Sequence, residues 1–366
     1  MLKKWRYIFI AIIILIVAGV VLWWLLGAFS KSGSTSEVVA LPFSISADEK
    51  LFALGSNFNA LFSYDPNTKK IERLVETSNP NASINAPQKL AGNFLGFEVN
   101  SQGNATGSGS ADFYTLNLDT GILVDEAAIS SHFDGIDFIA QGEFVYTQPV
   151  NPSAPFNEYS DEVFLFRNGT TTEIGHISNP GLYGSDMSHS SDGKYLFFAN
   201  NIYDMTAGVW RPVPAGCAGN QSAWLNNDVL VLKTVRDDSG VGPLCYYDLS
   251  TGAEKTIGAA QWFSVAENDI FYEPVFTTTN LSQIRIYDFA KKTDKTLISN
   301  AKLSMREYDP NNWGWVLYQP VVNDRQCFTV DCLGGTASGS LMLFNFGTGS
   351  SSSIMVGTST DFVSWL

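Results

Sequence analysis

The feature that most constrains this chain is one short phrase that recurs at intervals of 37 to 57 residues. In its clearest copy, "CYYDLSTGAEKTIG" (Cys245–Gly258), an aromatic run is followed by Asp, a Thr-Gly turn and a second short run. This pattern predicts a two-stranded hairpin. The Asp-like position of the turn falls at Asp65, Asn117, Arg167, Asp204, Asp248, Asp288 and Asn345. The copy at Arg167 has a shortened turn, and we interpret the copy at Asp204 as having shifted turn residues.

Each hairpin is preceded by further short apolar runs, so the repeating unit is larger than the hairpin. "DVLVLK" from Asp228 is one such run, and "SAWLNND" from Ser222 lies before it. The unit is therefore four strands in about 40–50 residues, a period typical of propellers and solenoids. Four antiparallel strands per unit favour a propeller. We predict an all-β fold, a seven-bladed β-propeller of four-stranded blades over residues 38–366, with no second domain.

The N-terminus carries a different signal, an uncharged apolar run from Tyr7 to Phe29. At about 1.5 Å per residue, a helix of this length extends roughly 34 Å, enough to cross a bilayer. The cations of "MLKKWR" precede the run, which predicts a cytoplasmic stub at residues 1–6. We expect an uncleaved transmembrane signal-anchor helix at 7–29, a tether at 30–37 and an extracytoplasmic domain at 38–366. "AFS" (Ala28–Ser30) is a weak alternative cleavage site.

The composition limits the classes of partner. Charged residues are only 16% of the chain and the formal net charge is −14, so nucleic acid is not an expected partner. The sequence contains neither a P-loop nor a dinucleotide-binding glycine motif, and we predict no cofactor. The partner that we expect is a protein or an envelope polymer. The oligomeric state is not predicted.

Four cysteines, Cys217, Cys245, Cys327 and Cys332, all follow the apolar run. An even number in an oxidising compartment favours two disulfides, for which three pairings are possible. The alternative is a zinc site, but CxxC spacing is missing and no His lies near these cysteines. From their positions in the repeats we predict the pairs 217–245 and 327–332, and no metal site.

One stretch, "SHSSDGKYLFFA" (Ser188–Ala199), resembles the S-x-D-G-K-x-L-x-F signature of TolB-type, WD40-like propeller repeats. "SISADEKLFAL" (Ser44–Leu54) is a weaker version. The resemblance implies a propeller that serves as a binding platform, and it carries over no catalytic residue. The order of stub, anchor and propeller also resembles the dipeptidyl-peptidase-IV family, whose hydrolase follows the propeller. Because this sequence ends at Leu366, directly after its last repeat, we expect no hydrolase here.

Residues with catalytic potential are sparse in the sequence. The three histidines, His132, His176 and His189, lie in loop-like polar contexts, and none has a second ligand at metal-site spacing. The acidic residues of "FDGID" (Phe133–Asp137) and "VRDDSG" (Val235–Gly240) could bind calcium, but solvated turns are the expected reading. We predict a non-catalytic platform. The alternative is a glycan-active hydrolase or lyase that uses carboxylates in the central channel.

Long variable loops are the expected binding surface, because they lie on a rigid scaffold. Three of them follow a Tyr and a Pro-Val pair, at Tyr146, Tyr272 and Tyr318. With Arg325 these tyrosines are the candidate partner-binding residues, although strand-ending prolines are the preferred explanation of the pattern. The runs "VVALPFSIS" (Val38–Ser46) and "DFVSWL" (Asp361–Leu366) should close the ring of blades.

Overall fold

The computed structural model describes residues 38–40, 51–54, 59–65, 68–79, 81–100, 111–129, 133, 135–151, 160–178, 187–235, 240–266, 268–274, 282–301, 303–304, 315–320, 341–345, 350–354 and 362–365. The chain divides into two compact units, Met1–Glu37 and Val38–Leu366. The predicted stub, apolar helix and tether belong to the first unit and lie outside the described residues. Within the described ranges, no helix is long and apolar enough to cross a membrane.

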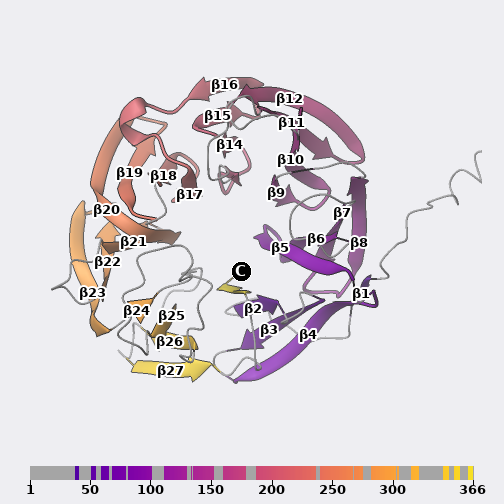
Figure 1. Ribbon diagram of the computed structural model, residues 1–366, viewed down its shortest axis with the longest axis horizontal. Coiled ribbons are helices and arrows are strands. Elements are labelled where there is room, and N and C mark those ends of the chain that lie inside the picture. Colours follow the sequence, from indigo (N-terminus) through magenta and orange to yellow (C-terminus); the bar gives the residue numbers. More distant parts are fainter. Residues whose placement is uncertain are drawn as a thin grey trace, which may run out of the picture. The chain divides into compact units, whose positions relative to one another are not determined.

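The unit Val38–Leu366 is all-β, and its strands pair antiparallel in sheets arranged around a common centre (Figure 1). The first two sheets are β1-β4-β3-β2-β28 and β5-β6-β7-β8. Their strands are β1 (Val38–Ala40), β2 (Leu51–Leu54), β3 (Ala60–Asp65), β4 (Lys70–Thr77), β28 (Phe362–Trp365), β5 (Ser83–Leu90), β6 (Phe94–Asn100), β7 (Ala111–Asn117) and β8 (Leu123–Ile129).

The third and fourth sheets each have four strands that pair in chain order. Their strands are β9 (Gly135–Ala140), β10 (Glu143–Pro149), β11 (Ser160–Arg167), β12 (Thr170–Ser178), β13 (Ser188–His189), β14 (Tyr195–Phe198), β15 (Asn201–Asp204) and β16 (Val209–Pro212). A short 3₁₀ helix, η2 (Ala215–Cys217), follows β16. In each of these sheets the first strand lies innermost, as β9 does in Figure 1.

The next sheet has seven strands, β17 to β23, and the last has four, β24 to β27. Their strands are β17 (Gln221–Trp224), β18 (Val229–Lys233), β19 (Gly242–Asp248), β20 (Ala253–Ala266), β21 (Asp269–Pro274), β22 (Ser282–Asp288), β23 (Thr293–Ala301), β24 (Leu303–Ser304), β25 (Trp315–Pro320), β26 (Leu341–Asn345) and β27 (Ser350–Ile354). The 14-residue strand β20 pairs with β19 through its first half and with β21 through its second.

The repeated phrase forms a hairpin turn that is held by its own Asp or Asn. In the β19–β20 turn, Asp248 Oδ1 accepts a hydrogen bond from the N–H of Thr251 (3.2 Å), and the N–H of Gly252 donates to Asp248 O (2.8 Å). Gly252 has φ +71°, which glycine adopts without strain. The turns at Asn117 and Asp204 repeat these contacts. The Asp204 turn is therefore regular, and the prediction that its turn residues are shifted is wrong.

The copy at Arg167 does have the shortened turn that the sequence predicts. Only Asn168 and Gly169 separate the paired residues Arg167 and Thr170. Both turn residues have positive φ, +50° and +80°, which is the geometry of a two-residue type I′ hairpin. The Asn-Gly pair is the usual sequence for such a turn.

The stretch that resembles the TolB-type signature forms the turn between β13 and β14. Ser190 Oγ accepts a hydrogen bond from the N–H of Tyr195 (3.0 Å) and donates one to Asp192 Oδ1 (2.7 Å). The same Asp192 oxygen accepts the N–H of Lys194 (3.1 Å), and Gly193 takes φ +68° between them. The Ser, Asp and Gly of this motif therefore hold a turn in place.

Both termini of the Val38–Leu366 unit join the first sheet, but they do not pair with each other. The C-terminal strand β28 pairs with β2, from Leu51↔Trp365 to Leu54↔Phe362. The N-terminal strand β1 pairs with β4 at the opposite edge, with Val38 opposite Thr77. The C-terminal strand thus supplies the innermost position, beside the centre in Figure 1, and β1 lies outermost.

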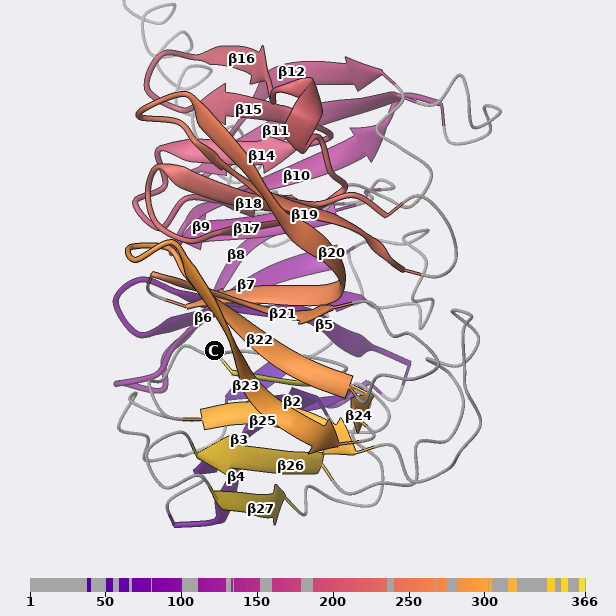
Figure 2. The ribbon, with the colours of Figure 1, turned by 90° about the vertical axis from the view of Figure 1, so that its left-hand side faces the viewer.

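Two faces can be defined from the first sheet. Strands β2 and β4 run in the same direction, because each is antiparallel to β3. Their C-terminal ends, Leu54 and Thr77, mark what we call the loop face. The turn between Asp65 and Lys70 lies at the other end of the strands, on what we call the tip face. The β15–β16, β19–β20 and β22–β23 hairpins turn on one side of Figure 2.

Hydrophobic cores lie between neighbouring sheets, because alternate side chains of each strand face opposite neighbours. Leu61 and Leu74 of the first sheet pack with Phe97 of the second. The second sheet packs in turn on Phe138 of the third. This contact requires Gly96, since a Cβ there would lie 2.6 Å from Phe138 Cγ.

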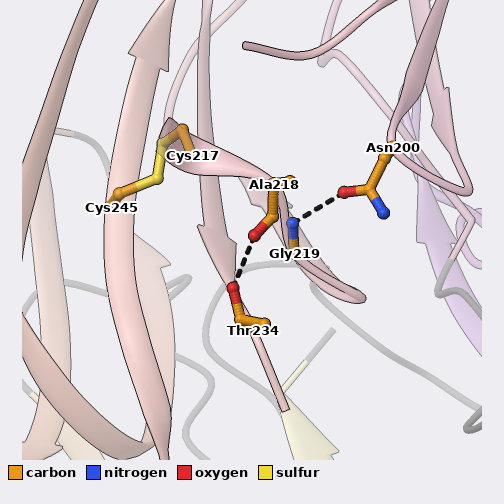
Figure 3. Close-up of a disulfide and its surroundings, with 6 residues drawn as sticks. All are labelled: Asn200, Cys217, Ala218, Gly219, Thr234 and Cys245. Atoms are coloured by element: carbon orange, nitrogen blue, oxygen red, sulfur yellow. Dashed lines mark hydrogen bonds between the residues drawn. A yellow bond between two sulfur atoms is a disulfide. The ribbon is translucent and has the colours of Figure 1, made fainter. Parts of the chain in front are cut away.

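A disulfide joins Cys217 of η2 to Cys245 of β19, as predicted, with the two Cα atoms 5.6 Å apart (Figure 3). Both cysteines are buried in the core between the fourth sheet and the start of the seven-stranded sheet. The N–H of Gly219, just after η2, donates to Asn200 Oδ1 (2.7 Å). The connection from β16 to β17 is thus fixed to both of the sheets that it joins.

Candidate functional site: a polar network at the innermost strands

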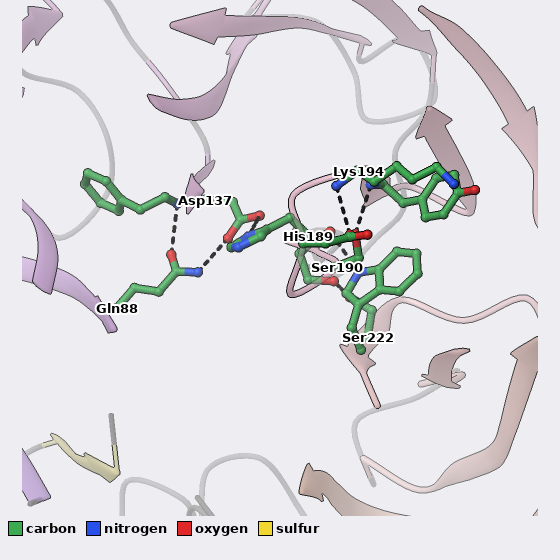
Figure 4. Close-up of polar contacts among 11 residues, drawn as sticks. Gln88, Asp137, His189, Ser190, Lys194 and Ser222 are labelled. Carbon is green, nitrogen blue, oxygen red and sulfur yellow. Dashed lines mark hydrogen bonds and ion pairs between the residues drawn. The ribbon is translucent and has the colours of Figure 1, made fainter. Parts of the chain in front are cut away.

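Polar side chains from four consecutive innermost strands meet around the centre of the molecule (Figure 4). We call this set the inner-strand network. It consists of Gln88 on β5, Asp137 on β9, Ser188 and His189 on β13, and Ser222 and Trp224 on β17. Each of these strands is the inner edge of its group, so its unpaired backbone groups, which face the centre, need partners from elsewhere.

Gln88 supplies such a partner to β9. Its side-chain oxygen accepts the N–H of Phe138 (2.9 Å), and its Nε2 donates to Asp137 Oδ1 (2.8 Å). The amide thus pairs with both a backbone group and a carboxylate of the next sheet. One side chain closes part of the β9 edge and joins the second sheet to the third.

Asp137 continues the connection to β13 through its second oxygen, which lies 2.8 Å from His189 Nδ1. The Asp137 side chain is 3% exposed and the His189 side chain 15%. A carboxylate can only accept, so Nδ1 carries the proton that is shared in this contact. The prediction that the acidic residues of "FDGID" lie in a solvated turn is wrong for Asp137, because this residue is in a strand and its carboxylate is buried.

The negative charge of Asp137 helps to raise the pKa of His189. Burial alone would lower the pKa of the imidazole, but the Asp137 carboxylate and its hydrogen bond raise the pKa above the ordinary value of 6.5. Glu143 and Asp192 act in the same direction. Within the described residues, no group of three or more His, Cys, Asp or Glu side chains is placed to hold a metal ion.

The network reaches the seven-stranded sheet through two contacts of Ser188. Its hydroxyl lies 2.7 Å from the hydroxyl of Ser222, and its backbone carbonyl accepts the indole N–H of Trp224 (3.2 Å). Trp224 also stacks on Tyr195, with ring centroids 6.1 Å apart. The inner edges of four consecutive groups of strands are thus joined side chain to side chain.

Two further buried carboxyl groups have raised pKa values. Burial raises the pKa of Glu98 on β6 to about 7, against the opposing effect of a hydrogen bond with Asn85. Burial raises the pKa of Glu273 on β21 to about 8, and nearby Lys233 offsets part of this rise. Both glutamates therefore hold a proton close to neutral pH, unlike a solvated carboxyl group.

Two of the predicted partner-binding residues lie inside the protein. Tyr146 on β10 is 6% exposed and stacks on Phe164, with ring centroids 5.2 Å apart. Burial raises its pKa, against the effect of a hydrogen bond with Thr171. Tyr272 on β21 is 4% exposed and donates to Asp294 Oδ2 (2.7 Å). Burial and that contact raise the pKa of Tyr272 to about 12.

The other predicted site residues fall largely outside the described part. Tyr318 is placed in β25 by its backbone, which pairs with Met342 of β26, and its side chain is not described. Arg325, Cys327 and Cys332 lie in the undescribed range 321–340. The structure therefore does not bring the three tyrosines and Arg325 together as one cluster of described side chains.

Little in the amino-acid pattern predicts the inner-strand network. His189 and Ser188 stand in the stretch that resembles the TolB-type signature, which was the available signal. Gln88 and Asp137 belong to no recurring pattern, and they are 49 residues apart in the chain.

Together, the radial sheets, the C-terminal strand in the first sheet and the cores between neighbouring sheets define the class of protein: this is a β-propeller fold. No protein-family model matches the sequence, and no curated protein matches it.

Solved structures of similar fold include proteins of several kinds. Prolyl endopeptidases match with a TM-score of 0.55 and 13% identity, over 82% of this chain and 48% of theirs. A dipeptidyl peptidase 4 from Porphyromonas gingivalis matches with a TM-score of 0.52 and 12% identity, over 91% and 55%. An oligogalacturonate lyase in complex with manganese matches with a TM-score of 0.51 and 10% identity, over 72% and 80%. This chain spans about half the length of the two peptidases. At these identities the likeness shows the fold alone.

Proposed function

We propose that this protein is a seven-bladed β-propeller, tethered to a membrane by Tyr7–Phe29, that binds a protein or an envelope polymer outside the cytoplasm without catalysing a reaction. The seven-stranded sheet supports the blade number, because it can be divided into two four-stranded blades that share β20. With the other five sheets this makes seven groups, the same number as the copies of the hairpin phrase.

Two observations support the proposed location. The uncharged run from Tyr7 to Phe29 is long enough to cross a bilayer, and the cations before it favour a cytoplasmic N-terminus. The Cys217–Cys245 disulfide suits an oxidising compartment outside the cytoplasm.

The observation that carries the proposed platform role is how the inner-strand network uses its polar groups. Asp137 engages both of its oxygens, one with Gln88 and one with His189, and its side chain is almost fully buried. A carboxylate bound in this way joins blades, and a substrate would have to displace these contacts to reach it. Binding then falls to the loop face, where Tyr318 and Arg325 are the proposed anchor residues. Tyr146 and Tyr272 would support the bases of their loops from inside.

The test is chemical cross-linking in intact membranes, followed by purification of the full-length chain. We expect the double variant Tyr318→Ala with Arg325→Ala to reduce capture of the partner while thermal unfolding stays unchanged. The matched control is Thr251→Ala with Thr348→Ala, two hairpin-turn positions of the tip face. If the control variant loses capture and the loop variant keeps it, the proposed face is wrong. If the wild-type protein cross-links to nothing, the platform role is wrong.

A second candidate, a glycan-active hydrolase or lyase, is favoured by one observation, the Asp137–His189 pair at the inner strands. An imidazole oriented by a carboxylate is a common general base, since its Nε2 can accept a proton. An oligogalacturonate lyase is among the proteins of similar fold. The test is incubation of the full-length protein with a panel of neutral and acidic polysaccharides. Product formation that His189→Gln abolishes would favour this candidate over the platform.

A further inference from the structure

We infer that two neighbouring seams between groups of strands form a binding surface for an acidic polysaccharide. The first, which we call the Tyr195 seam, lies between the fourth sheet and strands β17–β20. The second, which we call the Tyr246 seam, lies between strands β17–β20 and β21–β23. This surface uses none of the proposed loop-face anchors, so the inference goes beyond the proposed function.

Two cations lie against one ring in the Tyr195 seam. Lys194 Nζ is 4.6 Å from the centroid of the Tyr195 ring, and Arg211 Cζ is 5.2 Å from the same centroid. Trp224 stacks on this ring, with the two centroids 6.1 Å apart. The ring therefore holds both cations in place without neutralising them, because a cation–ring contact leaves the full charge on the cation.

The Tyr246 seam repeats this arrangement with two lysines. Lys292 Nζ lies 4.8 Å from the centroid of Tyr246 and 3.3 Å from that of Phe289. Lys255 Nζ lies 5.1 Å from the centroid of Tyr287 and donates a hydrogen bond to its hydroxyl (3.0 Å). Both lysines are exposed. Five of the six cation–ring contacts among the described residues thus lie in these two seams.

In the part of the chain that the structure describes, none of these four cations makes an ion pair. Asp204, the turn carboxylate of the first seam, accepts at Oδ1 the N–H groups of Thr206 and Ala207 (2.9 Å each). These bonds lower the pKa of Asp204, and the charges of Lys194 and Arg211 add to the effect. The chain as a whole has a formal net charge of −14. Four unpaired cations in adjacent seams therefore make a local surface that attracts anions.

Arg211 indicates which anion fits. Its Nε and Nη2 atoms are buried, and no described group accepts a hydrogen bond from them. These two nitrogens form one edge of the guanidinium, and such an edge can bind both oxygens of a carboxylate. Buried donors without acceptors are costly, so the pairing would be favourable. Because the residue as a whole is only half-buried, a carboxylate can reach this edge once the guanidinium turns outward.

An acidic polysaccharide carries carboxylates at regular intervals, so one chain can offer them to both seams. Tyr195, Tyr246 and Tyr287 are buried and cannot stack on a sugar ring, so recognition depends on charge. A stiff chain loses less conformational freedom on binding to fixed charges than a flexible acidic peptide does. The polysaccharide is therefore the favoured ligand.

Calorimetric titration of the full-length protein in detergent tests the inference. The probe is alginate, a linear chain with one carboxylate per sugar, and alginate with esterified carboxylates is the uncharged comparison. We expect only alginate to bind, with a Kd that rises with salt concentration. Lys255→Gln with Lys292→Asn, and separately Lys194→Gln with Arg211→Gln, should each raise the Kd about tenfold, because each double change removes charged hydrogen-bond donors.

The matched control is Lys70→Gln with Lys69→Asn, which removes the same charge from the exposed β3–β4 turn. Lys69 and Lys292 both have positive φ, +59° and +55°, a conformation that Asn tolerates. The control should leave the Kd unchanged.

Three outcomes would overturn the inference. The wild-type protein does not bind alginate, the control variant loses as much affinity as the seam variants, or polyglutamate binds more tightly than alginate and makes an acidic protein the better ligand. Thermal unfolding verifies that each variant is folded, and if Arg211→Gln prevents folding, the lysine pair of the Tyr246 seam decides. Tyr318→Ala with Arg325→Ala should leave alginate binding unchanged, so failure of this inference and failure of the proposed loop-face site are distinguishable.

Discussion

His189 Nδ1 lies 2.8 Å from Asp137 Oδ2, and this one contact connects the innermost strands β13 and β9. The histidine belongs to the stretch Ser188–Ala199 that also builds the turn before β14, so one short segment forms a turn and joins two blades. The partner carboxylate is held from its other side by Gln88. Removal of any of the three side chains leaves a buried polar group without its contact, which is more costly than loss of an exposed pair.

The pH dependence of stability should show this pair directly. Because the folded-state pKa of His189 is raised above 6.5, its contribution is complete below the unfolded pKa and is lost as pH rises through the folded pKa. We expect the melting temperature of His189→Gln to fall below that of the wild type at pH 6, and the gap to narrow above the raised pKa. Calorimetry across pH 5–9 measures it. A gap that is constant over this range would show that His189 stays neutral.

Asp137→Asn tests the same contact from the other side. The amide keeps the shape of the carboxylate but removes its charge, so we expect a loss of about 1–3 kcal/mol in the free energy of unfolding near pH 6. The double variant Asp137→Asn with His189→Gln should lose less than the two single changes added together, because the residues share one interaction. Denaturant titration supplies the three values. Strict additivity would contradict a direct coupling.

Glu273→Gln should stabilise the protein at alkaline pH. The folded pKa of Glu273 is about 8 and its ordinary value is 4.5, so the unfolded chain releases the proton first. Stability is thus lost as pH rises from about 4.5 to about 8. The neutral amide cannot ionise, and we expect the variant to melt higher than the wild type at pH 8.5 and about equally at pH 4.5. A variant that melts lower at both pH values would show that the carboxyl group makes a contact that the amide cannot replace.

Deletion of residues 361–366 should destabilise the whole ring. This deletion removes β28, the strand that pairs with β2 and joins the chain's end to the first sheet. Its loss leaves the inner edge of β2 unpaired and opens the ring of sheets. We therefore expect a lower melting temperature and a broader unfolding transition. Deletion of Leu366 alone, which lies outside β28, is the control. An unchanged transition in the longer deletion would mean that closure adds nothing to stability.

The two predicted disulfides should contribute unequally to the free energy of unfolding. Cys217 and Cys245 close a chain separation of 28 residues, for which the chain-entropy estimate is about 3.6 kcal/mol. The proposed pair of Cys327 and Cys332 would close a much shorter loop, worth about 2.2 kcal/mol. We expect Cys217→Ala with Cys245→Ala to lower stability more than the other double change does. Non-reducing peptide mapping verifies the pairing, and a Cys245–Cys327 peptide would contradict it.

The repeat made much of the fold predictable. The hairpin turns at Asp248 and Asn117 depend on contacts within a few residues, so their sequence carries nearly all of their structure. The prediction of shifted turn residues at Asp204 was wrong, because the Asp and Gly of this turn keep the spacing of the other copies. The Cys217–Cys245 disulfide could be predicted because both cysteines fall in adjoining repeat positions.

The inner-strand network was not predictable in this way. His189 and Asp137 are 52 residues apart, and they meet because consecutive blades place their first strands around one centre. Tyr146 and Tyr272 were candidate surface anchors because each precedes a proline near a loop. An aromatic ring at the end of a strand is equally suited to a core. Whether the ring is buried depends on its neighbours in the folded chain, which are Phe164 for Tyr146 and Asp294 for Tyr272.

The continuous strand β20 has a consequence for how this chain can vary in length. Elsewhere a blade could be gained or lost at a connection between sheets, where the backbone leaves one ladder before it enters the next. Along Ala253–Ala266 the backbone passes from one ladder to the next within a single strand, and Ala260 pairs in both, so a breakpoint there falls inside paired structure. The two flanking four-stranded groups are therefore expected to be inherited, exchanged between proteins and unfolded as one module of seven strands.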